Sequence, residues 1–534
     1  MFSNLYILTF FITVSVIIFY FSLKVSTWGN AINLGYIFTL LLISFSKGFD
    51  FDMFVLVGTR LVMPLMIINA IMYELLFHVG KGKPEKQYVF RMPLSSGSMK
   101  LKDIRRGVSI IGAAGSGKTE SVVAQFLRHF SRHSFSGIIH DYKNFELSRI
   151  AYPLFKESKL PFYLISFDRV FHKVNPIAPR YMLDEESVNE ISRVLLENLL
   201  EKKESSFSGS SKFFNDAAEG IIGGLIWKLK TDYPHYCTLP HMIAIFQQCT
   251  TYELVELLSS NFTSKAMANA FINGVESERQ TAAVKSTLSN AFKKISTQRI
   301  FMVLSEDEIP LDINNAENPG VISVVNNPKF ESAYSPIIAT VIHSITKQMS
   351  VHDRLGSFIL MEEASTIRLL NMQRIPATLR SYNISTVYVI QDKIQNDILY
   401  GREAGKAILS NLSYQFFGKV NDPETAKYYE SFFEIVKRKS ISVSKSDNLN
   451  FDTRTTKSER EVAKIRADLF FRLKPGQFVS FSDGKDRKVK FAAPQWSKEL
   501  PTPKHEVTPE ELESNFQKIY REVKTIISTE IQKK

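Results

Sequence analysis

Eight consecutive residues in this sequence have the types and spacing that hold the phosphates of a nucleotide. The pattern G-x-x-x-x-G-K-[ST] is matched in full by Gly112-Ala113-Ala114-Gly115-Ser116-Gly117-Lys118-Thr119. Glycines allow backbone N–H groups to converge on phosphate oxygens, and the helix that follows from Glu120 adds its positive dipole end. We expect Lys118 to bridge the β- and γ-phosphates and the Thr119 hydroxyl to bind Mg²⁺. The sequence therefore predicts a site for ATP and Mg²⁺ at residues 112–120.

Two adjacent acids are candidates for the other half of such a site. The apolar run Ser357–Met361 is typical of a buried strand, and it ends in Glu362 and Glu363. We expect Glu362 to hold the magnesium, usually through water, and Glu363 to polarise the attacking water. The first acid is Glu where Asp is more usual, so either the geometry shifts by one methylene or hydrolysis is slow. The alternative is a strand that merely ends in surface acids.

A third group of polar residues lies around the next apolar run, Ile384–Ile390. This run ends in Gln391, whose amide could sense the γ-phosphate or orient water, or could simply end a strand. Arg374 and Arg380 precede the run, and either could reach the nucleotide of a neighbouring subunit as an arginine finger. We take Gln391 and Arg380 as candidate catalytic residues beside Lys118.

The elements that must position these residues alternate between strands and helices. Strand-like runs separated by helical patterns predict a parallel sheet flanked by helices; the runs are Gly107–Ile111, Ser136–His140, Phe162–Phe167, Gly320–Val325, Ser357–Met361 and Ile384–Ile390. One stretch, Asp184–Thr297, has helical periodicity and no convincing strand. It is too long for a connection, so we interpret it as an inserted all-α domain.

The predicted organisation has five segments. They are a membrane anchor at 1–86, the first part of the nucleotide-binding domain at 87–183, the all-α insertion at 184–297, the second part of the nucleotide-binding domain at 298–500, and a C-terminal amphipathic helix at 501–534. That last helix is indicated by Thr508 at the N-cap, Pro509 after it and Glu511 three residues after the cap. Its apolar stripe is expected to dock on the nucleotide-binding domain or on a neighbour.

The N-terminal segment contains long uncharged runs. Leu5–Leu23 and Trp28–Ser46 are each long enough to cross a bilayer. A third run, Met53–Phe77, contains Arg60, Pro64 and Glu74, so it is either a functional span or an interfacial helix. The number of transmembrane helices is therefore two or three. A basic cluster follows at once and predicts that the rest of the chain is cytoplasmic.

Composition narrows the partners and the compartment. The 534 residues carry a formal net charge of +12, which favours polyanions or an anionic membrane surface, although it also fits a basic surface without a specific partner. Cys237 and Cys249 are the only cysteines, which excludes a disulfide scaffold and a cysteine-based zinc site. A further segment, Val436–Lys464, is rich in Lys, Arg, Ser and Thr and alternates in polarity. It predicts an exposed hairpin that faces a pore or a polyanion, or else a solvated loop.

Taken in order, these features resemble the TraG/TraD-like coupling proteins of conjugative type IV secretion systems. The resemblance spans residues 100–490, and besides the phosphate loop and the acids it includes the segments Asp141–Leu147, Asn175-Pro176-Ile177, Ile408–Asn411 and Asn421–Ala426. The segment Asp141–Leu147 is close to a D-x-K-G-E-L signature. It departs from it where Asn144-Phe145 adds one residue, so Asp141 and Lys143 are carried over only loosely.

The resemblance implies a RecA-like P-loop motor domain in a ring-shaped homo-hexamer at the bacterial inner (cytoplasmic) membrane. The ATPase domain of this multi-pass protein would lie in the cytoplasm beside membrane lipid. It implies an ATPase of the DNA-translocase type that moves relaxase-bound single-stranded DNA to the components of the secretion channel in conjugation. A docking receptor for protein substrates with little turnover is the second hypothesis, and the Glu at position 362 favours it. A chromosome-segregation translocase is a third, but only about 30 residues follow Pro503, which is too few for the winged-helix domain it requires.

Overall fold

The computed structural model describes residues 86–200, 209–445 and 453–532, together with eight isolated positions between residues 35 and 68. The chain divides into two compact units, Met1–Lys86 and Gln87–Lys534. The two predicted membrane spans and the third candidate, Met53–Phe77, fall almost entirely outside the described residues. Among the helices that are described, none combines the length and the apolar character that a membrane span requires.

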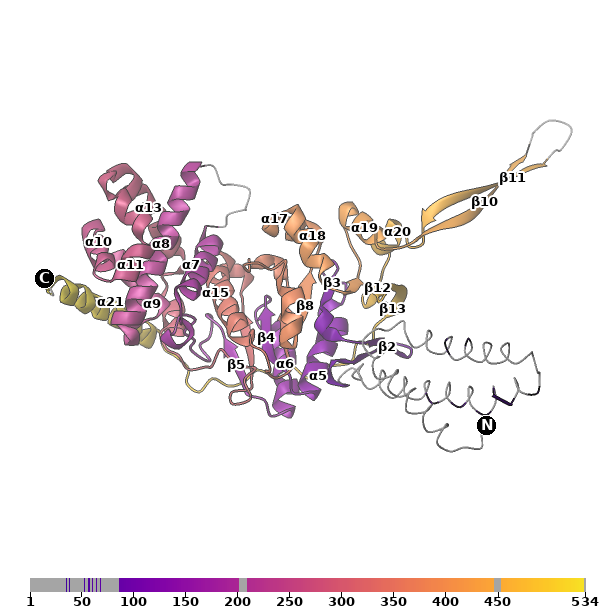
Figure 1. Cartoon of the computed structure of the whole chain (residues 1–534), viewed down its shortest axis with the longest axis horizontal. Coiled ribbons are helices and arrows are strands. Elements are labelled where there is room, and N and C mark those ends of the chain that lie inside the picture. The colour runs from indigo at the N-terminus through magenta and orange to yellow at the C-terminus, as the bar shows by residue number, and fades with distance from the viewer. Residues whose placement is uncertain are drawn as a thin grey trace. The chain divides into compact units, whose positions relative to one another are not determined.

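The second unit is built on a nine-stranded sheet with the order β13-β12-β9-β3-β8-β7-β4-β6-β5 (Figure 1). Its strands are β3 (Val108–Ile111), β4 (Ser136–Asp141), β5 (Phe162–Ile165), β6 (Val321–Val325), β7 (Ser357–Met361), β8 (Ile384–Ile390), β9 (Tyr414–Phe417), β12 (Gln477–Ser482) and β13 (Lys485–Lys490). The six predicted strands are confirmed, and they pair in parallel. The sheet is not wholly parallel, because β12 pairs antiparallel with both β9 and β13.

Burial on both faces explains why the central strands are continuous apolar runs. Phe358 and Leu360 of β7 lie in a core cluster with the helix after the phosphate loop, whereas Ile359 and Met361 belong to the larger cluster on the opposite face. The helices of this layered domain are α5 (Ala124–Arg132), α6 (Glu146–Glu157), α15 (Glu331–Met349), α16 (Ile375–Leu379), α17 (Lys393–Tyr400), α18 (Arg402–Ser410), α19 (Pro423–Glu430) and α20 (Ala467–Phe471). A small antiparallel pair, β1 (Phe90–Pro93) and β2 (Ser98–Leu101), precedes the sheet.

A helical segment separates β5 from β6, where the all-α insertion is expected. It contains α7 (Glu185–Leu199), α8 (Gly209–Asp232), α9 (Leu239–Gln248), α10 (Thr251–Ser259), α11 (Phe262–Met267), α12 (Asn269–Asn273), α13 (Glu278–Ile295) and α14 (Gln298–Leu304). The described residues between β5 and β6 include no strand. The helices therefore continue one element beyond Thr297, because Thr297 itself caps α14 by accepting a hydrogen bond from the Ile300 amide.

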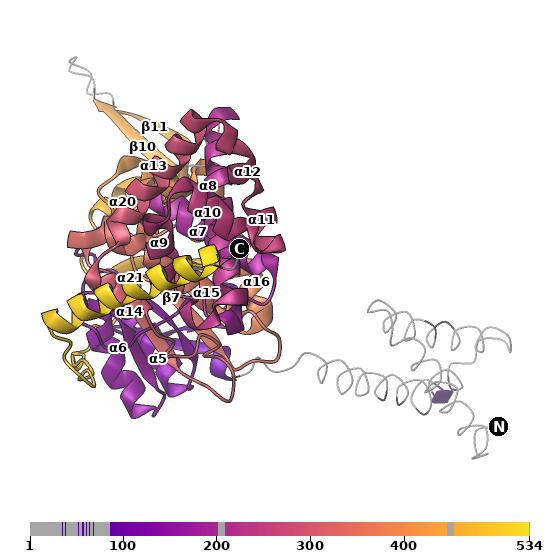
Figure 2. The ribbon, with the colours of Figure 1, turned by 90° about the vertical axis from the view of Figure 1, so that its left-hand side faces the viewer.

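The C-terminal helix α21 (Pro509–Gln532) begins as the sequence predicts. Thr508 and Glu511 form the reciprocal capping bonds, from the Thr508 amide to the Glu511 carboxylate at 2.8 Å and from the Glu511 amide to the Thr508 hydroxyl at 3.3 Å. The helix does not dock on the sheet. It crosses the helical insertion beside α9 and α14 (Figure 2), where Phe516 and Tyr520 pack against Phe301.

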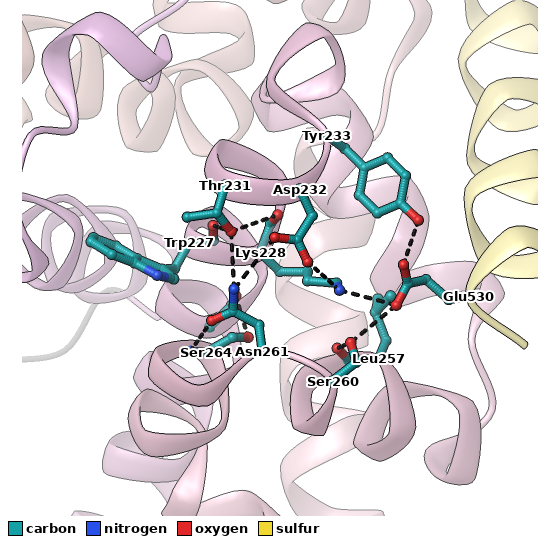
Figure 3. Close-up of polar contacts among 11 residues, drawn as sticks. Trp227, Lys228, Thr231, Asp232, Tyr233, Leu257, Ser260, Asn261, Ser264 and Glu530 are labelled. Atoms are coloured by element: carbon teal, nitrogen blue, oxygen red, sulfur yellow. Dashed lines mark hydrogen bonds and ion pairs between the residues drawn. The ribbon is translucent and has the colours of Figure 1, made fainter. Parts of the chain in front are cut away.

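A buried polar network fastens the end of α21 to the insertion (Figure 3). The Glu530 carboxylate accepts hydrogen bonds from Lys228 Nζ at 3.0 Å, from the Tyr233 hydroxyl at 2.5 Å and from the Ser260 hydroxyl at 3.0 Å. Lys228 is 3% exposed and also pairs with Asp232. A buried ammonium needs anionic partners, so the Lys228–Glu530 pair links α21 to α8. The bond from Ser260 links α21 to the end of α10.

Candidate nucleotide-binding site

The predicted phosphate loop joins β3 to a helix, and its backbone is shaped by glycine. Gly115 and Gly117 have φ values of +74° and +85°, which residues with a side chain rarely adopt. At Gly117, a Cβ would also lie 2.8 Å from the amide nitrogen of Gly476. The loop is held by bonds from the Gly112 amide to the Ile390 carbonyl at 3.2 Å and from the Ala113 amide to the Lys419 carbonyl at 2.7 Å.

The helix after the loop begins with a π-helical turn, Lys118–Val123, and continues as α5. Val122, Val123, Phe126 and Leu127 are fully buried, as the apolar pattern predicts. The first N–H groups of a helix have no acceptor within the helix, so this turn presents donors toward the loop. Burial lowers the pKa of Lys118, which is 5% exposed and donates to the Gly112 carbonyl. Lys118 is therefore folded back onto the loop that it closes.

The predicted acids lie directly beside Thr119. The Thr119 hydroxyl donates to Glu362 Oε1 at 3.2 Å, and Glu362 and Glu363 are each only 1% exposed. They are not surface acids at a strand end, because β7 pairs with β4 and β8 in the middle of the sheet. Glu363 has the left-handed φ of +45°, which turns the chain sharply after β7.

Lys143 lies between the two acids and was carried over from the sequence only loosely. Its Nζ is 3.4 Å from Glu362 Oε1 and 3.4 Å from Glu363 Oε1. These carboxylates raise the pKa of Lys143 by more than its partial burial lowers it. Asn144 and Phe145, the two residues that break the D-x-K-G-E-L pattern, have φ values of +47° and +72°. Two successive residues with left-handed φ values thus form the turn where the signature has glycine. Lys143, just before this turn, still contacts Glu362 and Glu363.

Asp141 makes the surroundings of Glu362 strongly acidic. Its Oδ2 accepts bonds from the amide and the hydroxyl of Ser148, both at 2.6 Å, and burial raises its pKa. Burial, followed by the charge of Asp141, raises the pKa of Glu362 to about 7. Glu362 Oε2 is buried and has no hydrogen-bond partner. A cation beside Thr119 would satisfy this oxygen and favour the ionised carboxylate.

Gln391 joins the site, and Arg380 does not. Gln391 Nε2 donates to Glu363 Oε1 at 3.3 Å, so the amide and the second acid are held together. Arg380 precedes β8, at the other end of the parallel strands, and lies 3.6 Å from Asp103 Oδ2, in the residues before β3. The phosphate loop follows β3, whereas Arg380 precedes the neighbouring parallel strand β8. Arg380 and the loop of the same chain therefore lie at opposite ends of the strands. Arg374 is likewise on the surface before β8.

Glu120, expected to bind the nucleotide, is tied to the segment after β13. The Trp496 indole N–H donates to the Glu120 carbonyl at 2.9 Å, and Lys498 Nζ lies 3.1 Å from Glu120 Oε1. A second contact to the loop comes from Gly476, whose amide donates to the Ser116 carbonyl at 2.9 Å. These contacts could not be predicted from the sequence. Only the turn signal Pro475-Gly476 pointed to a special backbone there, and it gave no indication of what that turn touches.

Comparisons with known proteins agree with this fold. Residues 357–475 match a family model described as the TraM recognition site of TraD and TraG. The bacterial conjugative coupling protein TrwBdeltaN70 in its unbound form is similar over 79% of this chain and 93% of its own, with a TM-score of 0.61 and 11% identity. The plasmid coupling protein TrwB in complex with ADP and Mg²⁺ gives a TM-score of 0.60 at 11% identity, over 79% and 94% of the two chains. No curated protein is similar enough in sequence to count as a match.

The sheet and the Gly112–Thr119 loop define the class as a P-loop protein of the α/β type. At 11% identity the solved structures establish the fold, and the family model covers the segment with the acids, Gln391 and the strands around them. The resemblance to the TraG/TraD-like coupling proteins is thereby confirmed.

Proposed function

We propose that this chain is an inner-membrane ATPase that couples relaxase-bound single-stranded DNA to a type IV secretion channel and drives its transfer in conjugation. One observation carries the proposal. Thr119, Glu362, Glu363 and Gln391 meet at the carboxyl edge of a sheet shared with the coupling protein TrwB, which has been solved with ADP and Mg²⁺. The membrane anchor rests on the uncharged runs Leu5–Leu23 and Trp28–Ser46, and the homo-hexamer and the channel contacts rest on the family resemblance.

Each residue of the site has a role that follows from its position. Amides at the start of the helix bind phosphate oxygens. Lys118, which donates to the carbonyls of Gly112 and Ala113, would donate to phosphate oxygens instead. The buried Glu363 accepts a proton from the attacking water, and Gln391 holds its carboxylate in place. Lys143 partly neutralises the charge of the two acids. Arg380 does not reach the phosphate loop of its own chain, so it would act as an arginine finger at the nucleotide of a neighbouring subunit.

The residues present fit magnesium. The ion favours oxygen ligands and is usually held by one or two protein oxygens together with substrate phosphates. Thr119 Oγ1 and Glu362 Oε1 lie 3.2 Å apart, and Glu362 Oε2 has no other partner. Bound there, magnesium supplies charge neutralisation at the phosphates. The Glu side chain at position 362 therefore reaches the Thr119 hydroxyl.

ATP hydrolysis by the full-length chain, with and without single-stranded DNA, tests the proposal. We expect hydrolysis that DNA stimulates and that Lys118→Ala abolishes. Tight ATP binding without turnover in either condition would contradict the motor. It would instead favour a docking receptor for protein substrates, the second candidate, which is supported by the Glu at position 362 where Asp is more usual.

A further inference from the structure

Two strand pairs lie outside the large sheet in the part of the chain that the structure describes. One joins β10 (Ile435–Lys445) to β11 (Thr453–Ala463) and confirms the hairpin predicted at Val436–Lys464. The other is the β1–β2 hairpin at the start of the second unit. The exposed face of this second hairpin has a composition that the nucleotide site does not explain.

The β1–β2 hairpin is continued by a third strand. Leu94, directly after β1, pairs antiparallel with Phe491, directly after β13. The Ser95 amide also donates to the Lys490 carbonyl at 2.9 Å. The end of β13 therefore extends the surface of the hairpin.

The two sides of this three-stranded surface differ in character. Its inner side packs into one core cluster through Met92, Leu101 and Val489, which are buried. Successive residues of a strand alternate between faces, so their neighbours along each strand lie on the outer side. Four of these neighbours are basic and exposed, and we call them the basic face: Arg91, Lys100, Lys488 and Lys490.

Two residues of the basic face are arranged in a way that destabilises the hairpin. Arg91 lies directly opposite Lys100, and like charges in that position repel across a strand pair. Lysines that protect a sheet edge from pairing with another chain would account for β13, which is an edge strand. They do not account for the Arg91–Lys100 pair. An anionic ligand on this side would turn the repulsion into attraction.

The acids near the basic face already have partners. Strands β1 and β2 contain no acidic residue. Asp486 of β13 lies 2.9 Å from Lys464 Nζ, and Asp483, in the turn before β13, pairs with Arg106. Within the described ranges, none of the four residues of the basic face forms an ion pair. Their charge is therefore available to a ligand.

We propose that the basic face binds the anionic phospholipid headgroups of the membrane in which the first unit is proposed to be anchored. Headgroup phosphates accept charge-assisted hydrogen bonds from Lys and Arg. Each basic residue beside an anionic leaflet strengthens the attraction about fivefold.

The position of the basic face in the sequence favours lipid over a soluble polyanion. Strand β1 begins at Phe90, four residues after Lys86 at the end of the first unit, so it is the strand nearest in sequence to the predicted membrane runs. A membrane anchor would hold this strand beside lipid at a high effective concentration. The inference goes beyond the nucleotide site and rests on the membrane anchor of the proposed function.

Covalent labelling of lysines in the full-length chain tests the basic face directly. The chain is reconstituted into nanodiscs of phosphatidylcholine, alone or mixed with phosphatidylglycerol, and acetylation of each lysine is followed by mass spectrometry. We expect Lys100, Lys488 and Lys490 to react at least about fivefold more slowly in the anionic discs, and the difference to shrink at high salt. Lys265 and Lys293, which are exposed on the helical insertion, are internal controls and should react equally in both discs.

A double variant tests whether the four residues act as one surface. Arg91→Gln with Lys100→Gln removes the opposed pair, and because that pair is repulsive, we expect the variant to fold. The two lysines of the basic face on β13 should then lose most of their protection in anionic discs. The matched control, Lys265→Gln with Lys293→Gln, loses the same charge and should leave that protection unchanged. Full protection in the first variant would contradict a single binding face.

The remaining outcomes separate this inference from the proposed function. Equal acetylation in neutral and anionic discs, by a chain that is inserted and hydrolyses ATP, would overturn the lipid contact while the proposed function stands. A chain that inserts into neither disc would contradict the membrane anchor and the inference with it. If added single-stranded DNA slows acetylation of the basic face and anionic lipid does not, the face binds nucleic acid and the lipid assignment is overturned.

Discussion

We expect ATP hydrolysis to depend most directly on Glu363. It is buried and accepts a hydrogen bond from Gln391. Glu363→Gln keeps the volume but cannot accept a proton, so we expect turnover to fall by at least about 10²-fold while ATP affinity is retained. Single-turnover hydrolysis and equilibrium binding of ATP separate the two effects. Equal losses in binding and turnover would show that Glu363 supports the structure of the site instead.

Lys143 is predicted to set the pH range of the enzyme. It opposes the effects of burial and Asp141, which together raise the pKa of Glu362 to about 7. Lys143→Gln removes that opposition and should raise the pKa of Glu362 further, so the rate at neutral pH should fall several-fold and recover as the pH increases. Lys143→Arg keeps the charge and is the control. A pH–rate profile with an unchanged acidic limb would argue against this role.

The helix that carries the phosphate loop gives a prediction about stability. Burial lowers the pKa of His129 on α5 to about 4, although its Nε2 contacts the Gln87 carbonyl at 2.8 Å. The unfolded chain, with a pKa near 6.5, binds more protons between these values, so stability is lost as the pH falls through that window. We expect the free energy of unfolding to drop by about 1 kcal/mol from about pH 7.5 to 5.5 on account of His129. Denaturant unfolding of His129→Gln should show a correspondingly smaller drop, and an identical drop would be contrary evidence.

The C-terminal helix should depend on Glu530 for its attachment. Glu530→Ala leaves the buried Lys228 with Asp232 alone and removes the acceptor of Tyr233. We expect a loss of about 2 kcal/mol, with faster amide exchange confined to α21 and its contacts. Lys518→Ala, on the exposed surface of the same helix, is the control and should change stability by less than about 0.5 kcal/mol. Exchange that rises equally in both variants would contradict the role of the network.

The sequence was informative about elements wherever burial imposes a regular pattern. Strands β3 to β8 are apolar on both faces and were predicted, as was α21 from its cap and stripe. Gln415 interrupts the short apolar run of β9, and every residue of β13 except Val489 is charged, so neither strand stood out. Contacts between distant segments could not be predicted, because Gly476 and Ser116 are 360 residues apart in the sequence and meet only in the folded chain. The destination of α21 was wrong for the same reason: an apolar stripe does not identify its partner.

The role of Arg380 as an arginine finger is a prediction about contacts between neighbouring subunits. Arg380 lies at the sheet edge opposite its own phosphate loop, so in a ring it could act only on a neighbour's nucleotide. Arg380→Ala and Lys118→Ala should each be inactive alone. Mixing them should restore some ATP hydrolysis, because an intact loop then meets an intact arginine across some interfaces. A mixture that stays inactive, although mixed rings of wild-type and variant chains are shown to form, would exclude Arg380 as the arginine finger.

Thr119 and Glu362 are proposed to hold a magnesium-bound nucleotide over the Gly112–Thr119 loop. Titration of the full-length chain with ATP, with and without Mg²⁺, measures it directly. We predict that Mg²⁺ tightens ATP binding, that Thr119→Val removes this gain but keeps the magnesium-free affinity, and that Lys118→Ala weakens both. Binding that is indifferent to Mg²⁺ and unchanged by Lys118→Ala would contradict the account.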